Sequence, residues 1–227
     1  MSFVTTSTAD GHVLPLFEAK PVGVPKAGVV VLHEAFGVTP HIQQMCVWLA
    51  GQGYHAVAPE MFARAEPVAD KRDLPYNKEG FEQGRVYIHA TPKAHWLADC
   101  NAAAAYLQGF GLPVAAVGYC WGGSLAYLMA CQTPGVKAAD SYYGGMIPEL
   151  VATMKPNCPV QFHLATHDRY FPLDTAVNAI NHHLPNAPVH VYVADHGFNR
   201  NGGITYDDEA AQLARSRTLA FLAECVR

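Results

Sequence analysis

The residues with the clearest potential for chemistry surround a cysteine in the middle of the chain. Residues 118–123 read Gly-Tyr-Cys-Trp-Gly-Gly, after an apolar run at 113–117 and before a run of small and apolar residues at 124–131. This pattern predicts a strand, a sharp turn and a helix, with the central side chain lifted out at the carboxyl end of a sheet. The start of the helix leaves unpaired N–H groups beside that side chain. We therefore predict that Cys120 is a nucleophilic thiol.

A G-x-C-x-G match alone is weak evidence, because most cysteines are inert core residues. Three further polar residues follow predicted strands: Glu34 follows 29–32, Asp168 follows 160–164 and His196 follows 189–193. The carboxyl ends of parallel strands meet at one edge of a sheet, where ligands bind. The order nucleophile, acid, histidine is that of the α/β-hydrolase arrangement. We therefore expect a Cys120–His196–Asp168 triad.

Each assignment has a plainer alternative. Asp168 could be a turn or N-cap residue that accepts nearby backbone N–H groups. His196 is one of twelve histidines, and His167 is its main rival as the base, although it adjoins Asp168 in the sequence. Ser124 falls in the first helical turn, where serine is ordinarily a cap.

The histidines do not predict a metal site. His163 and His167 are four residues apart, but in a strand that spacing separates them by about 13 Å. The sequence contains neither an H-E-x-x-H motif nor a paired C-x-x-C motif, and it has no phosphate-binding glycine loop. We expect no metal and no organic cofactor.

Strands alternate with helices along the chain, which predicts an α/β fold: a mostly parallel sheet with helices on both faces. The β-branched apolar runs indicate strands at 29–32, 55–58, 114–117, 138–143, 160–164 and 189–193, and residues 12–17 suggest an antiparallel edge strand. Helical periodicity indicates helices at 41–51, 93–107, 124–131, 173–184 and 207–223. The segment 62–91 lacks clear periodicity and is interpreted as an irregular excursion, a candidate lid, with a helix around 79–89.

Length and composition limit the function classes. The chain has 227 residues, 50% of them hydrophobic and 15% charged, so we expect one domain over 1–227. The net charge is −4 and the sequence has no run of Lys or Arg, so we expect no basic surface that would bind nucleic acid or an anionic membrane. No signal peptide or stretch of about 18 apolar residues is present. We expect a cytoplasmic protein with six free thiols, a monomer or weak homo-oligomer.

Several motifs together resemble the dienelactone hydrolase (carboxymethylenebutenolidase) family, cysteine-dependent members of the α/β-hydrolase fold. Besides the turn at 118–123, they are His-Glu-Ala-Phe-Gly-Val at 33–38, Gly-Gln-Gly-Tyr at 51–54, Ala-Pro-Glu-Met-Phe at 58–62, Tyr-Tyr-Gly-Gly at 142–145 and His-Gly-Phe-Asn-Arg at 196–200. The resemblance covers nearly the whole chain. It is more specific for the family than for its substrate.

The resemblance implies a division of labour among the residues already singled out. Cys120 would be the nucleophile, His196 its ion-pair partner and Asp168 the group that orients the imidazole. Glu34 would hold the resting thiol and take its proton when substrate enters. The backbone N–H groups of Trp121 and Ala35 would form the oxyanion hole, and water would hydrolyse a thioester intermediate.

The substrate implied is a small lactone or ester, with dienelactone from halocatechol breakdown as the best-known example. Members of the family bind the carboxylate of this lactone with two arginines, and one of them corresponds to Arg200. Phe81 stands where the other is expected, so Arg85, one helical turn on, is a candidate replacement. Alternatively, Phe81 lines an apolar pocket with Phe36, Trp121 and Tyr143, which favours a carboxylesterase for uncharged or aromatic esters.

Two readings from other classes remain open. Cys120 could be a redox-responsive thiol on a hydrolase-like scaffold, with Cys131 as its resolving partner. The chain could also be a binding domain with an inert thiol.

Overall fold

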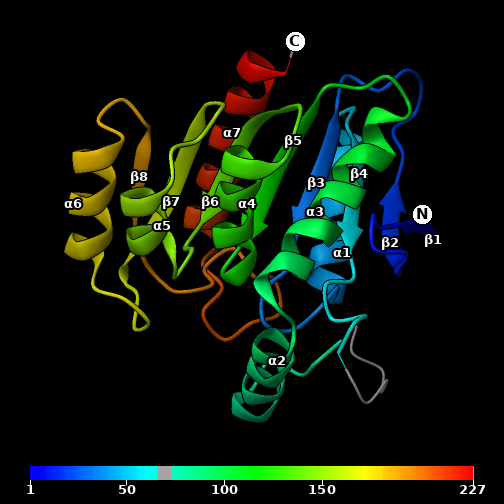
Figure 1. Cartoon of the computed structure of the whole chain (residues 1–227). Coiled ribbons are helices and arrows are strands. Elements are labelled where there is room, and N and C mark those ends of the chain that lie inside the picture. The colour runs from blue at the N-terminus through cyan, green and yellow to red at the C-terminus, as the bar shows by residue number, and fades with distance from the viewer. Residues whose placement is uncertain (66–72, 227) are drawn as a thin grey trace.

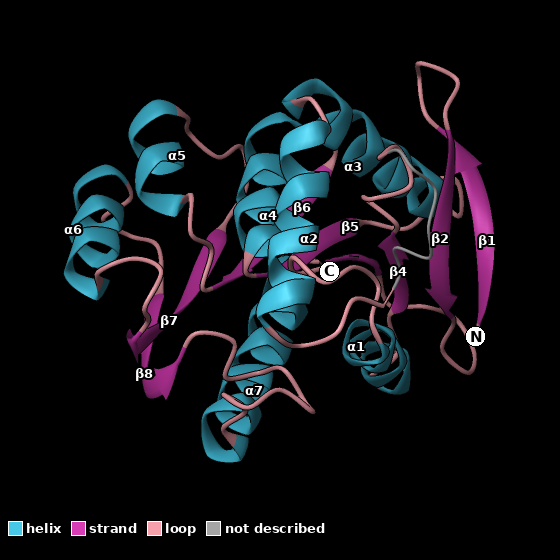
Figure 2. Ribbon diagram, turned by 90° about the horizontal axis from the view of Figure 1, so that it is seen from below, coloured by secondary structure: helices cyan, strands magenta, loops and turns pink. Residues whose placement is uncertain are grey.

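The central element of the computed structural model, which describes residues 1–65 and 73–226, is one twisted sheet. Its strands lie in the order β1 (Ser2–Ser7), β2 (Val13–Ala19), β4 (His55–Pro59), β3 (Gly28–Leu32), β5 (Val114–Tyr119), β6 (Val136–Tyr142), β7 (Val160–His167) and β8 (Val189–Asp195). Strand β2 pairs antiparallel with β1 and β4, and every other pair is parallel. The six parallel strands therefore end at one common edge, which faces the viewer in Figure 2.

Helices cover both faces of this sheet. Helices α1 (Pro40–Gly51) and α7 (Asp208–Cys225) lie on one face (Figure 2). The other face carries α3 (Lys93–Gln108), α4 (Trp121–Gln132), α5 (Ile147–Thr153) and α6 (Leu173–His183). Helix α2 (Lys78–Ala90) belongs to neither layer, because it lies below the carboxyl edge in Figure 1. None of the described helices is long and apolar enough to cross a membrane.

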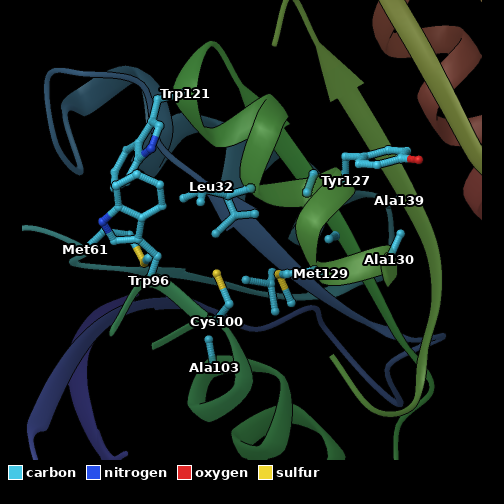
Figure 3. Close-up of a cluster of buried hydrophobic side chains, with 14 of the residues drawn as sticks. Leu32, Met61, Trp96, Cys100, Ala103, Trp121, Tyr127, Met129, Ala130 and Ala139 are labelled. Atoms are coloured by element: carbon cyan, nitrogen blue, oxygen red, sulfur yellow. The ribbon is translucent and has the colours of Figure 1, made fainter. Parts of the chain in front are cut away.

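Successive side chains of the strands point to opposite faces of the sheet and form two hydrophobic cores, one on each face. In β3, Val30 and Leu32 pack with α3 and α4, whereas Val29 and Val31 pack with α1 and α7. Figure 3 shows part of the first core, where Trp96 and Trp121 meet edge to face with ring centroids 5.4 Å apart. Strand β3 is buried on both sides, which explains its uninterrupted apolar sequence.

The fold predicted from the sequence is confirmed in its main features. All predicted parallel strands and helices are present, and the helix expected around 79–89 is α2. The strand expected at 12–17 is antiparallel but is not the edge, because β1 pairs with its outer side. Strand β1 and the short helix α5 were missed. The candidate lid at 62–91 includes residues 66–72, which lie outside the described residues.

Helix α2 lies in direct backbone contact with the loop after β3. A Cβ atom on Gly84 would lie 1.6 Å from the carbonyl oxygen of Ala35, far inside any contact distance. Asn77 caps the helix, with its side-chain oxygen accepting the N–H of Gly80 at 2.9 Å. The absence of a side chain at Gly84 thus fixes how closely α2 approaches this loop.

Gly84→Ala is expected to destabilise the protein by about 1–3 kcal/mol, because the added methyl group forces the helix away from Ala35. Helix propensity alone predicts the opposite sign, a gain of roughly 1 kcal/mol for alanine over glycine in a helix interior. Denaturant unfolding of the wild type and the variant measures the difference.

Gly51→Ala is the matched control, because Gly51 also lies in a helix and nothing lies within 4 Å of its Cβ position. This variant should be neutral or slightly stabilised. Equal effects of the two substitutions would refute the packing argument.

Candidate active site

Cys120 lies at the tight turn between β5 and α4, as the sequence predicts. Its backbone has φ 55° and ψ −118°, a conformation that non-glycine residues rarely adopt. Its N–H donates to the carbonyl of Tyr142 at 3.0 Å, and its own carbonyl accepts from Gly123 at 2.9 Å. A Cβ on Gly122 would lie 2.2 Å from the carbonyl oxygen of Leu32, so only glycine lets α4 pack this closely on β3. The turn presents the thiol, which is half-buried, at the carboxyl edge.

His196 and Asp168 meet at the same edge, although 28 residues separate them in the sequence. His196 Nδ1 lies 2.7 Å from Asp168 Oδ2, and both side chains are buried. The second carboxylate oxygen, Oδ1, accepts the backbone N–H of Tyr170 at 2.9 Å. The Asp168 carboxylate therefore binds the backbone of its own turn and the His196 ring at once, an arrangement compatible with both readings of this residue.

The electrostatic environment of His196 favours the protonated ring. Burial opposes the charged form, but the electrostatic interaction with Cys120 and the hydrogen bond to Asp168 outweigh it and raise the pKa of His196 to about 9. The other ring nitrogen, Nε2, is buried and has no hydrogen-bond partner of regular geometry among the described residues. This nitrogen is available for proton exchange with the thiol and a bound substrate.

Two backbone N–H groups, those of Trp121 and Ala35, have no hydrogen-bond acceptor among the described residues. Trp121 is the first residue of α4, whose N-cap is Cys120 without a side-chain cap, so its N–H has no acceptor within the helix. The N–H of Ala35 donates no hydrogen bond to any other described group. The indole of Trp121 itself packs away from the site, against His33, Phe62 and Trp96.

Glu34 is bound to Arg200, a pairing that the sequence did not predict. Arg200 Nε lies 2.7 Å from Glu34 Oε2, and its Nη2 lies 3.2 Å from Oε1, a buried bidentate ion pair. Burial opposes the charge of Glu34, but the guanidinium outweighs it and lowers the pKa of this carboxyl group. In this arrangement the Glu34 carboxylate accepts hydrogen bonds from Arg200, and the ion pair neutralises the charge of the guanidinium.

A pocket of about 410 Å³ opens beside Cys120 and His196. Of the residues expected to bind substrate, Phe36, Phe81 and Arg200 line it. The guanidinium carbon of Arg200 lies 4.8 Å from the ring centroid of Phe36 and 5.3 Å from that of Tyr76. The inner wall is therefore largely aromatic.

Two expected binding residues lie elsewhere. Tyr143 is fully buried and packs on His196, with ring centroids 4.9 Å apart, so it supports the imidazole and does not line the pocket. Arg85 is exposed, 3.7 Å from Glu82, because only the first turn of α2 borders the pocket and Arg85 lies one turn beyond it. The expected replacement of the second family arginine by Arg85 is therefore not supported.

Sequence reasoning missed other residues that line the pocket. Arg169 and Tyr170 directly follow Asp168, so their place at a strand end was a usable signal. Tyr76 and Lys78 lie in the segment that has no periodicity, and no signal marked them.

The rivals for the chemistry are placed away from the pocket. His167 is exposed, and Ser124 accepts the backbone N–H of Met146 at 3.0 Å, which is a structural role. His163 is fully buried, with its Nε2 3.0 Å from Asp140 Oδ1. Among residues 1–65 and 73–226, no group of three or more His, Cys, Asp or Glu side chains is arranged to hold a metal ion.

Comparison with known proteins identifies the family of the chain. A model of the dienelactone hydrolase family matches residues 14–226. A putative carboxymethylenebutenolidase of Azospirillum brasilense is 32% identical over 240 residues, covering 99% of each chain. The carboxymethylenebutenolidase of Pseudomonas putida is 32% identical over 230 residues, covering 97% of this chain and 95% of its own.

Solved structures give the same result. A putative dienelactone hydrolase from Klebsiella pneumoniae superposes with a TM-score of 0.81 at 28% identity, covering 99% of this chain and 100% of its own. An α/β serine hydrolase homologue from Coxiella burnetii shares the fold alone, with a TM-score of 0.67 at 14% identity over 96% of this chain and 97% of its own. The chain, with its α/β-hydrolase fold, therefore belongs to the dienelactone hydrolase family.

Proposed function

We propose that this protein hydrolyses small lactones or esters through a thioester on Cys120. The observation that carries the proposal is that Cys120, in its strained turn at the end of β5, lines one pocket with His196, whose ring is bound by Asp168. A cysteine at a helix start, next to an imidazolium, is the usual environment of a reactive thiolate.

In the first half-reaction, the Cys120 thiolate attacks the carbonyl carbon, and the C=O π electrons move to the oxygen. The N–H groups of Trp121 and Ala35 bind this oxyanion, and one such donor contributes on the order of 3 kcal/mol to the transition state. Collapse of the intermediate breaks the C–O bond. His196 gives its Nε2 proton to the departing alkoxide, and a thioester remains.

In the second half-reaction, the now neutral His196 accepts a proton from water as the water oxygen attacks the thioester carbon. Collapse expels the Cys120 thiolate, and the imidazolium forms again. Asp168 fixes the ring through Nδ1 in both steps, so Nε2 always carries the exchanging proton. With a pKa of about 9, His196 is a better resting proton acceptor than Glu34, whose pKa is lowered.

The pocket supports uncharged or aromatic esters as a second substrate candidate beside dienelactone. Phe81 lines the pocket together with Phe36 and Tyr76, and the charge of Arg200 is balanced by Glu34. Turnover of dienelactone and of 4-nitrophenyl benzoate, compared as kcat/KM, distinguishes the two. A higher kcat/KM for dienelactone would rule out the aromatic-ester preference.

A redox role for Cys120 with Cys131 has less support. The two residues flank nearly the full length of α4, and eleven residues of helix span about 16 Å. A disulfide needs Cα atoms within about 7 Å of each other. Hydrolysis therefore remains the better proposal for this thiol.

Cys120→Ala and His196→Ala are each expected to lower kcat for 4-nitrophenyl acetate by at least about 1,000-fold, because nucleophile and base act as one unit. Cys158→Ala is the control, because Cys158 is a half-buried cysteine outside the pocket and this variant should keep full activity. Mass spectrometry after rapid quenching should find the acetyl group on Cys120. Unchanged turnover in Cys120→Ala would exclude the thioester mechanism.

The pH profile reports on His196. Because its folded-state pKa is raised to about 9, the imidazolium persists through neutral pH and is lost as pH rises through 9. We expect kcat/KM to fall on that high-pH side. Asp168→Asn removes a charge that holds the proton on the ring, so the falling limb should move to lower pH.

Asp174→Asn is the matched control, because Asp174 is an exposed carboxylate in the first turn of α6, outside the pocket. Its profile should coincide with that of the wild type. If kcat/KM of Asp168→Asn falls at the same high pH as that of the wild type, a group other than His196 causes the fall.

A further inference from the structure

We propose that Lys78 and Arg169 form an anion-binding subsite at the outer rim of the pocket, which selects esters that carry a carboxylate or phosphate away from the reacting carbonyl. The inference rests on the proposed hydrolase function and deepens it. It names positive groups other than Arg200 and Arg85, the two arginines that the sequence suggested.

The two cations are brought together by the fold, not by the sequence. Lys78 is the first residue of α2, and Arg169 lies in the loop between β7 and α6, directly after Asp168. Contact between Phe81 and Tyr170, with ring centroids 5.3 Å apart, joins the first turn of α2 to this loop. Both Lys78 and Arg169 are exposed and line the same pocket as Cys120.

Among the described residues, no acidic side chain balances the charge of Lys78 and Arg169. No Asp or Glu of the described chain lines the pocket, and neither Lys78 nor Arg169 forms an ion pair with a described residue. Arg169 donates to the hydroxyl of Tyr170 at 3.2 Å and stacks on its ring at 5.2 Å, contacts that orient the guanidinium without neutralising it. Arg200, by contrast, is held by Glu34. The free positive charge of the pocket is therefore at its rim.

The aromatic side chains between rim and nucleophile define the rest of the ligand. The ring of Tyr170 lies 4.5 Å from that of His196, and Phe81 lies beyond Tyr170. An anionic group beside Lys78 and Arg169 is thus separated from the scissile carbonyl by at least one ring-sized apolar body. The ligand class is an amphipathic ester with its carbonyl at Cys120 and its anion at the rim.

The test compares 4-nitrophenyl hydrogen glutarate, which is anionic, with its neutral methyl ester at low ionic strength. In the double variant Lys78→Glu, Arg169→Gln, the ratio of kcat/KM values, anionic over neutral, should fall about tenfold, the combined effect of two partly screened charge contacts. The fall should come mainly from KM. Added salt should reduce the wild-type ratio, because exposed charges are screened.

Arg85→Glu is the matched control, because Arg85 is an exposed cation of the same helix that does not line the pocket. Its ratio should stay at the wild-type value. If Arg85→Glu lowers the ratio as much as the double variant, general charge and not a subsite explains the preference, and the proposal is wrong. An unchanged ratio in the double variant also overturns it.

Binding to the Cys120→Ala protein separates this proposal from the proposed function. Glutarate and inorganic phosphate, titrated separately and followed by NMR shifts at α2 and the 168–172 loop, distinguish a carboxylate from a phosphate preference. Both should bind more weakly when Lys78 and Arg169 are replaced. Failure of the wild type to hydrolyse either ester would reject the function, whereas absence of this binding would reject the subsite alone.

Discussion

The structure of the site depends on one strained backbone position. Cys120 adopts φ 55° with a full side chain, which costs on the order of 1–3 kcal/mol and persists only where the surroundings enforce it. The enforcing contacts are backbone contacts: the bond from Cys120 to the Tyr142 carbonyl and the close packing of Gly122 on Leu32. Because these contacts join β3, β5, β6 and α4, the position of the thiol is a property of the sheet and not of a loop.

Charge around the thiol is arranged in two separate pairs. Asp168 with His196 lies on one side, and Glu34 with Arg200 lies on the other. A buried charge without a partner costs several kcal/mol. Because each charge has its own partner, neither pair leaves an unpaired buried charge near the thiol. Between the two pairs, the pKa of His196 is raised to about 9 while that of Glu34 is lowered, so the imidazole is the better proton carrier of the two.

The sequence predicts most of the fold because its strongest signals are local. Uninterrupted β-branched runs such as 28–32 specify strands buried on both faces, and the glycines around Cys120 specify the tight turn. Strand β1 was missed because its mostly exposed residues carry no apolar run, and α5 because it spans only seven residues. Strand ends also located Cys120, Asp168 and His196, since topology alone brings them to one edge.

The partners of charged side chains could not be predicted in the same way. Glu34 and Arg200 are 166 residues apart, and nothing local says that they bind each other. Arg85 shares helical spacing with Phe81, yet the pocket ends after the first turn of α2. The partner of a charged side chain depends on where each helix ends and on how closely the elements pack. The hydrophobic periodicity of the sequence does not specify either of these.

The contact between Gly84 and the Ala35 carbonyl has a mechanical consequence. The first turn of α2 lines the pocket through Lys78 and Phe81, and Ala35 precedes Phe36, which also lines it; the N–H of Ala35 is the proposed second oxyanion donor. With no side chain between them to deform, the two behave as touching rigid bodies. A ligand that pushes the wall therefore also presses on the peptide that would receive the negative oxygen, so the shape of the bound molecule and the alignment of that donor are set together.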